Sequence, residues 1–272
     1  MYCKNCEEYL RYDNDFCGGC GAKIIRNRLT VKGVFAEVKE EYLVSDNKLF
    51  LTFWHLLVKP EAVIQGYIDG RRKRYLNVIA YVALSLTVLG IYLFLLRNFF
   101  PDDPFAAEFN RNLLDGRKLA DLTPEQQEKF LESSKKFSNF MNSFSDLLGL
   151  IIIITTPINA LASYIIFITK RKHNYAEHIV LNYYMAAQTS ILSSVISIGA
   201  LPFVGNSVTT ALIITLISLI YIGYVFKRIY GISVFESFYK TILFYILQTT
   251  IVFFLMIFLG GIGAGIYFWL FK

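Results

Sequence analysis

Cysteine is absent from residues 21–272, and all four cysteines of the chain lie near its amino terminus. They are spaced as Cys3-x2-Cys6 and Cys17-x2-Cys20, with ten residues between the pairs. Two Cys-x2-Cys pairs can supply four thiolates to one tetrahedral metal ion and leave no open coordination position. The spacing therefore predicts a zinc ribbon over residues 1–25, in which zinc has a structural role.

Three other interpretations of these cysteines remain open: a pair of disulfides, a rubredoxin-like iron site and a metal-free loop. Disulfides fit poorly, because the long hydrophobic stretches all lie downstream and the charge pattern keeps this end of the chain in the reducing cytoplasm. Gly18, Gly19 and Gly21 surround Cys20. We expect them to provide positive φ angles and close approach of the backbone to the sulfurs.

Residues 1–25 also lack an apolar stretch, so we expect no secretory signal here and expect insertion to begin at the first span. Hydrophobic residues make up 55% of the chain and the mean hydropathy is +0.46. Windows long enough to cross about 30 Å of hydrocarbon lie at 76–96, 147–169, 179–200, 208–226 and 241–270. The predicted fold class is an all-α polytopic membrane protein with about five transmembrane helices and a small N-terminal zinc ribbon.

Basic residues cluster beside alternate ends of these windows. They are Arg71, Arg72, Lys73 and Arg74 before the first, Lys170, Arg171 and Lys172 after the second, and Lys227, Arg228 and Lys240 between the fourth and fifth. All three clusters fall on one side if the amino terminus is cytoplasmic, as the positive-inside rule requires. Five spans then place the carboxyl terminus outside. The glycine-rich last window could be a tilted helix, a broken helix, or a span with a re-entrant end.

Residues 26–75 form a predicted juxtamembrane region. Phe35, Val38 and Tyr42 share one helical face, and the aromatic run at 49–57 is too short to span. We expect that run to lie in the membrane interface, with Trp54 at headgroup depth and lysines on either side. A second helix is expected to begin at Pro60 and to end near residue 70.

The segment 97–146 is predicted to be an extracytoplasmic loop of the membrane domain, which covers 76–272. Its helix begins after Thr123 and carries an apolar stripe from Phe130 onward. The cluster Arg71 to Arg74 could bind lipid headgroups or could serve only as a topology anchor. Nucleic-acid binding is not expected, because the region before the first span holds 13 basic and 10 acidic residues.

A polar segment precedes the third span and contains Asn174, Glu177 and His178. Asn174 is expected to cap this helix, with Glu177 closing the capping box. A polar binding site and a catalytic site are alternatives. Neither His-Glu-x-x-His nor His-x-x-Glu-His occurs, so the pattern of a zinc hydrolase is absent.

Ionisable residues are absent from the five windows, which disfavours an ion-coupled transporter. The polar residues that remain suggest helix packing: Ser190, Ser193, Ser194 and Ser197 share a face of the third span, and Gly261 and Gly265 form a small-xxx-small pair in the last. Pro157 should kink the second span.

The ordered motifs resemble a bacterial membrane family catalogued as domain of unknown function 3667. They are the two Cys-x2-Cys pairs, Lys59-Pro60-Glu61, the run from Gly66 to Asn77, and the run from Asn174 to Val180. Where that family often has proline, this chain has Val78. The resemblance implies a ribbon, a juxtamembrane helical region and a helical domain in the bacterial inner membrane, and it implies no reaction.

From these features we interpret the chain as a membrane-embedded docking or regulatory protein whose cytoplasmic zinc ribbon binds a partner. Its expected partners are the lipid bilayer and either a second copy or another membrane protein. A lipid or small-solute transporter, with its path among the third and fifth spans, is the alternative. A membrane-bound enzyme is the least favoured class, because no nucleophile, acid pair or catalytic metal spacing is present.

Overall fold

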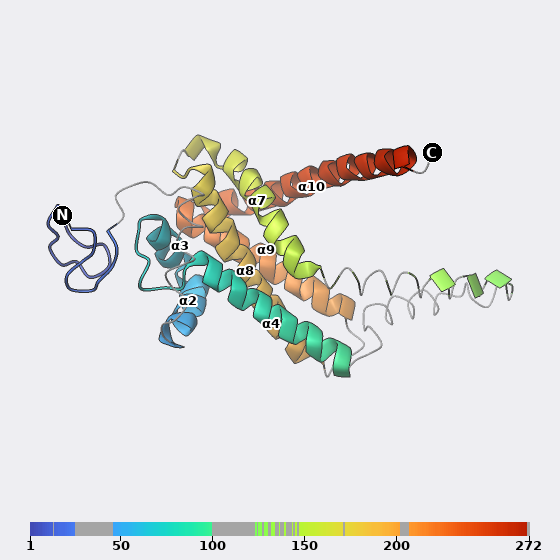
Figure 1. Ribbon diagram of the computed structural model, residues 1–272, viewed down its shortest axis with the longest axis horizontal. Helices are drawn as coiled ribbons and strands as arrows, with labels where there is room; N and C mark the ends of the chain where they lie inside the picture. The colour runs from blue at the N-terminus through green and yellow to red at the C-terminus, as the bar shows by residue number, and fades with distance from the viewer. Residues whose placement is uncertain are drawn as a thin grey trace. The chain divides into compact units, whose positions relative to one another are not determined.

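The computed structural model describes residues 1–12, 14–24, 46–99, 147–170, 172–201 and 207–270, with scattered positions between 123 and 145. For 46, 47, 207, 208 and 256–270 it describes the backbone alone. Seven α-helices and one 3-10 helix occur in this part of the chain (Figure 1). They are α2 (Asp46–Val58), α3 (Pro60–Ile68), α4 (Val78–Phe99), α7 (Leu148–Ile166), η2 (Ile168–Lys170), α8 (Tyr175–Ala200), α9 (Ser207–Tyr230) and α10 (Val234–Leu270).

Five of these helices, α4, α7, α8, α9 and α10, are long and apolar enough to cross a membrane. This confirms the all-helical fold class with five spans. The predicted helical face at Phe35, Val38 and Tyr42 and the apolar stripe from Phe130 lie outside the described residues.

Two compact units make up the chain. The first comprises Met1–Val82, Ile153–Ala186 and Tyr221–Lys272, and the second comprises Ala83–Ile152 and Ala187–Ile220. In the second unit Arg97 donates to the Ser145 hydroxyl at 3.0 Å, and Leu86 packs against Gly149 closely enough to crowd any added Cβ. The cysteines, α2 and α3 belong to the first unit.

Helix boundaries follow the expected capping chemistry. Helix α3 begins at Pro60, as predicted, because proline suits the first helical turn. It is followed by Gly70, whose φ of 98° requires a residue without a Cβ. Helix α4 begins at Val78, and the Asn77 side chain accepts a hydrogen bond from Ala80 N at 2.7 Å. Val78 thus occupies the first helical position, where the proline of the family pattern would also fit.

Two spans begin earlier than the hydropathy windows predicted. Helix α8 starts at Tyr175, so Glu177 and His178 belong to it, and α10 starts at Val234, so Glu236 and Lys240 belong to that helix. The apolar windows themselves contain no Asp, Glu, Lys, Arg or His, as predicted. The prediction is wrong for the complete helices α8 and α10, because the additional residues at their starts are ionisable. The reason is that hydropathy marks the apolar segment, whereas the capping residues mark the helix end.

The last window is a single helix. Helix α10 runs without interruption for 37 residues, through all four of its glycines, and is drawn as one coiled ribbon (Figure 1). Of the three possibilities left open, the broken helix is wrong. At about 1.5 Å per residue the helix is about 55 Å long, well beyond about 30 Å of hydrocarbon.

Helix α2 is tied to the ends of two spans by side-chain hydrogen bonds. Near the start of α4, Leu76 N donates to the Thr52 hydroxyl at 2.9 Å. Near the end of α9, the Tyr221 hydroxyl donates to the Leu56 carbonyl at 3.3 Å, and the Tyr224 hydroxyl donates to the Val58 carbonyl. The last carbonyls of a helix have no partner within it, so the two tyrosines satisfy groups that α2 leaves open.

Pro157 lies inside α7 and has no amide hydrogen to give to the carbonyl of Ile153, four residues earlier. The Tyr183 hydroxyl of α8 donates to that carbonyl at 3.0 Å, and the Tyr175 hydroxyl donates to the carbonyl of Pro157 itself at 3.1 Å. The hydrogen bond that proline removes from α7 is thereby replaced from α8.

Candidate metal centre and a buried polar cluster

The four cysteine sulfurs lie within 4.8 Å of one another. The Cys3 and Cys20 sulfurs are 3.7 Å apart, and those of Cys6 and Cys17 are 3.5 Å apart. A tetrahedral centre with metal–sulfur bonds of about 2.3 Å requires sulfurs about 3.8 Å apart, whereas a disulfide requires about 2.05 Å. All four cysteines are unpaired, and their spacing fits one metal ion. Cys3, Cys6, Cys17 and Cys20 can therefore hold a metal, as predicted.

The ribbon consists of two copies of one small hairpin. In the first, Cys3 N donates to Glu8 O and Glu7 N donates to Cys3 O, both at 2.8 Å. Fourteen residues later, with Cys17 in the place of Cys3, the same two bonds recur at 2.8 Å. The β-bridges Tyr2 to Tyr9 and Phe16 to Lys23 repeat in the same way. Each hairpin therefore delivers two thiolates to the centre from an equivalent backbone.

Positive φ occurs once in each hairpin, at the residue after the second cysteine. Gly21 has a φ of 62° and Glu7 has a φ of 64°. The expectation for Gly21 is confirmed, whereas Gly18 and Gly19 do not have positive φ. The first hairpin holds a non-glycine residue in this strained conformation, a cost that the bonds around the cysteines must offset.

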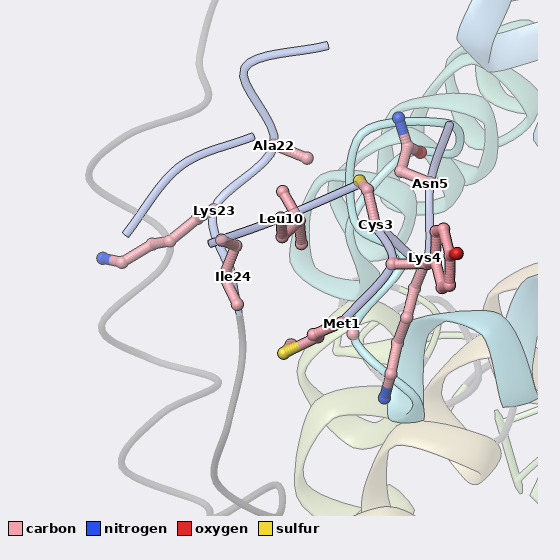
Figure 2. Close-up of a pocket in the computed structure, with 10 residues that line it drawn as sticks. Met1, Cys3, Lys4, Asn5, Leu10, Ala22, Lys23 and Ile24 are labelled. Carbon is pink, nitrogen blue, oxygen red and sulfur yellow. The ribbon is translucent and has the colours of Figure 1, made fainter. Parts of the chain in front are cut away.

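The ribbon contacts the loop that precedes α4. Lys4 Nζ donates to the Asp69 carbonyl at 2.7 Å, and Lys73 Nζ donates to the Cys20 carbonyl at 2.9 Å. A pocket beside the metal-binding residues is lined by residues of both hairpins and by Gly70 of this loop, and Figure 2 shows most of its lining. Its lining offers the amines of Lys4 and Lys23 and neither a carboxylate nor an imidazole.

The basic cluster is not a uniform surface. Arg72 lies over the Tyr67 ring at 4.9 Å, and burial lowers the pKa of its guanidinium. Lys73 contacts the ribbon, whereas Arg71 and Arg74 are exposed. Of the four predicted headgroup or anchor residues, these two remain most accessible to a lipid phosphate.

The predicted capping box is confirmed. Asn174 N donates to a Glu177 carboxylate oxygen at 2.7 Å, and Glu177 N donates to the Asn174 side-chain oxygen at 2.9 Å. Each side chain satisfies a backbone amide at the start of α8, where the first amides have no helical partner. Asn174 and Glu177 thus cap the start of α8, as their spacing predicted.

His178 does not lie on an open polar surface. It is 2% exposed, and its Nδ1 is 2.9 Å from the Ser163 hydroxyl of α7 while its Nε2 is 3.3 Å from the Tyr230 hydroxyl of α9. Ser163 also accepts from the Asn182 side chain at 2.7 Å and lies 3.0 Å from the Ala160 carbonyl, which can only accept. When Ser163 donates to that carbonyl, Nδ1–H donates to Ser163 and Nε2 accepts from Tyr230.

This network joins α7, α8 and α9 through the buried side chains of Ser163 and His178 and the half-buried side chain of Tyr230. Such a network is a structural cross-link when each polar group has a partner. His173, just before α8, extends it, since its Nε2 is 2.9 Å from the Gln65 side-chain oxygen of α3. Sequence reasoning missed Ser163, Tyr230 and Gln65. The buried residues Thr156, Ala160 and Ser163 mark one face of α7, a period that could have drawn attention to Ser163.

The predicted packing residues are distributed unevenly. Ser194 is 2% exposed, and its hydroxyl and that of Ser190 are buried without a hydrogen-bond partner among the described residues. The Ser193 hydroxyl donates to the Thr189 carbonyl of its own helix at 2.7 Å. Ser197 is half-buried, and Gly261 and Gly265 belong to the part of α10 described by backbone alone. Their role in helix packing stays a prediction.

Comparison with known proteins gives one family. Residues 46–90 match the family described as Protein of unknown function (DUF3667). This segment contains α2, α3, the basic cluster and the first half of α4. No curated protein and no solved structure matches the chain.

Proposed function

We propose a function in which the ribbon and residues 46–90 work together, because this segment matches the family described as Protein of unknown function (DUF3667) and contacts the ribbon through Asp69 and Lys73. The protein is a membrane-embedded docking or regulatory protein: zinc holds the ribbon, the ribbon binds a partner protein, and the helical domain holds the ribbon at the bilayer. No reaction is part of this proposal.

The observation that carries it is the aromatic surface of the ribbon. Tyr2, Tyr9, Tyr12 and Phe16 are all more than half exposed, and Tyr12 is 88% exposed. Tyrosine is enriched among the residues that dominate protein interfaces, because it offers a large apolar face and a hydroxyl at little cost in side-chain entropy. A ribbon of this size has no folding reason to expose so many aromatic rings.

Zinc is the metal proposed for the four thiolates. A closed tetrahedral sulfur site suits zinc or iron, and zinc adds no redox chemistry to a structural site. The sulfur spacing of 3.5 and 3.7 Å supports a tetrahedral thiolate centre, and measured metal content distinguishes the two ions. With four protein ligands the centre has no position for substrate or water.

The proposed location is the bacterial inner membrane, with a cytoplasmic amino terminus and an extracytoplasmic carboxyl terminus. The support is the number of spans together with the basic clusters: one precedes α4, one follows α7, and one surrounds the turn between α9 and α10. A reducing cytoplasm also keeps the thiolates available to the metal. The partner is a second copy of the chain or another membrane protein.

The test is capture of the tagged full-length protein from its native membrane in mild detergent. Two variants are compared with the unaltered protein: Cys17→Ser, which removes a metal ligand, and Tyr9→Ala with Tyr12→Ala, which leaves all four ligands in place. We expect one zinc per chain in the unaltered protein and in the tyrosine variant. A stoichiometric partner should be lost from both variants. Capture that is unaltered in both variants would refute the proposal.

A transporter for lipid or a small solute is the second candidate. The observation that favours it is a pair of buried hydroxyls on α8, those of Ser190 and Ser194, for which the described part of the chain offers no hydrogen-bond partner, since such groups can bind a polar solute. Flux in proteoliposomes should fall when Ser194 is replaced by leucine. A membrane-bound enzyme has less support, because the His178 imidazole is enclosed by its hydrogen-bond partners.

A further inference from the structure

Helix α2 exposes apolar side chains where a helix in water would expose polar ones. Phe50, Trp54 and Val58 follow one another at intervals of four residues and are 65%, 51% and 43% exposed. The opposite face is fully buried at Thr52 and Leu56. The residues Phe50, Trp54 and Val58 are called the α2 stripe below. Residues four apart lie on one side of a helix, so the stripe is a continuous apolar surface.

The hydrogen bonds between α2 and its neighbours fix the level of α2 along the spans. Thr52 is bonded to Leu76, two residues before α4 begins. Leu56 and Val58 are bonded to Tyr221 and Tyr224, in the last turns of α9. The apolar window of the first span begins at residue 76 and that of the fourth ends at residue 226. These contacts therefore place α2 near the ends of two apolar windows, where hydrocarbon gives way to headgroups.

The length of α2 agrees with this level. Its 13 residues extend about 20 Å at 1.5 Å per residue, which is too short to cross about 30 Å of hydrocarbon. Tryptophan prefers the interfacial layer, because its ring is apolar and its indole N–H needs a hydrogen-bond partner.

The charge around α2 is positive. Lys48 and Lys59 lie at its two ends, and Arg71 and Arg74 are exposed on the loop before α4. Two acids are close to Lys48 and Lys59 in sequence: Asp46, the first residue of α2, which is described by its backbone alone, and Glu61, which is bound by the Arg228 guanidinium. The cations therefore remain available to phosphate groups of anionic lipids.

We propose that the α2 stripe is buried in the interfacial layer of an anionic bilayer, on the side where α4 begins, with Lys48, Lys59, Arg71 and Arg74 among the headgroups. Helix α2 is thus a peripheral anchor beside the five spans. This assignment does not rest on the docking function of the ribbon, and neither zinc nor a partner protein enters it.

The test uses the fluorescence of Trp54. The chain has two tryptophans, so Trp269→Phe leaves Trp54 as the only reporter in the full-length protein. The protein is reconstituted into vesicles of phosphatidylcholine and phosphatidylglycerol whose chains carry bromine either near the headgroup or near the chain end. A matched reference combines Trp54→Phe and Trp269→Phe with Tyr12→Trp, which places the reporter at the most exposed aromatic of the ribbon.

We expect Trp54 to be quenched by the lipids brominated near the headgroup and to be several-fold less sensitive to aqueous acrylamide than the reference. Replacing half of the phosphatidylglycerol by phosphatidylcholine should weaken this quenching when Lys48, Lys59, Arg71 and Arg74 supply part of the attraction. If Trp54 is as accessible to acrylamide as the reference, the stripe faces water and the proposal is wrong. Protection from both acrylamide and brominated lipid would overturn it too, because a second copy or another protein would then cover the stripe.

Discussion

The hydrogen bond from the Tyr183 hydroxyl to the Ile153 carbonyl, four residues before Pro157, gives a prediction that can be tested without any assay of function. The Tyr183 hydroxyl donates at 3.0 Å to the Ile153 carbonyl, which Pro157 leaves without a helical partner. Tyr183→Phe removes the donor and keeps the ring. A net hydrogen bond contributes about 1 kcal/mol to stability, and bonds between membrane helices average about 0.6 kcal/mol. We therefore expect Tyr183→Phe to lower the free energy of unfolding by about 0.5–1.5 kcal/mol.

The same substitution should cost almost nothing in a Pro157→Ala background. Alanine restores a backbone N–H at position 157, which can bind the Ile153 carbonyl within α7 and make the tyrosine hydroxyl redundant. The interaction energy of this double-mutant cycle should therefore be close to the whole effect of Tyr183→Phe. Unfolding in mixed micelles with increasing denaturing detergent measures all four proteins.

Tyr224→Phe is the matched control. It also removes a hydroxyl that donates to a carbonyl, that of Val58 in α2, but Pro157 has no part in that bond. Its cost should be the same in both backgrounds. The reasoning is refuted if Tyr183→Phe costs as much in the Pro157→Ala background as it does in the unaltered protein.

Three further predictions concern the sites described above. In the same unfolding assay, Ser163→Ala should lower the free energy of unfolding by about 1–3 kcal/mol more than Ser193→Ala does. The reason is that it leaves the buried His178 ring without one hydrogen-bond partner. Equal costs would contradict the proposed cross-link between α7, α8 and α9. Glu7→Gly should strengthen metal binding in a competition assay by about 1 kcal/mol, because glycine adopts the φ of 64° at this position without steric strain. Unchanged or weaker binding would show that Glu7 is not strained there. Burial, with the nearby cations Arg74 and Lys59, lowers the pKa of His55 from 6.5, so the unfolded chain takes up its proton first and stability should fall as pH drops below about 6.5. His55→Gln should flatten that dependence, and an unchanged acid limb would exclude His55 as its source.

Local chemistry is the part of this structure that the sequence specifies best. The cluster of Cys3, Cys6, Cys17 and Cys20 could be predicted because the spacing of two Cys-x2-Cys pairs is a short-range pattern. The capping box of Asn174 and Glu177 could be predicted because capping acts over three residues. The five spans could be predicted because hydrocarbon thickness sets a minimum apolar length. The equal spacing of the two cysteine pairs also indicates that the ribbon consists of two similar hairpins.

Contacts between helices could not be predicted in the same way. Periodicity indicates which face of α7 carries Ser163, but it does not indicate which helix packs against that face. The partners of His178 come from α7 and α9, and the hydroxyl that compensates for Pro157 comes from α8. A chain with 18 tyrosines offers many donors for such a carbonyl. Only the packing decides which of them reaches it.

The small interior of the ribbon makes the arrangement of its exposed aromatic residues depend on a bound metal. Apart from the cysteines, that interior consists of Leu10, Ala22 and the partly buried Ile24. Domains below about 40 residues seldom fold on so little apolar burial and need a metal or disulfides. We expect the two hairpins to separate when no metal holds the four sulfurs together, so that Tyr9 of one hairpin and Phe16 of the other are no longer held in a fixed arrangement. Under the proposed docking function, the availability of the metal in the cell therefore sets the number of copies of the protein that can bind a partner.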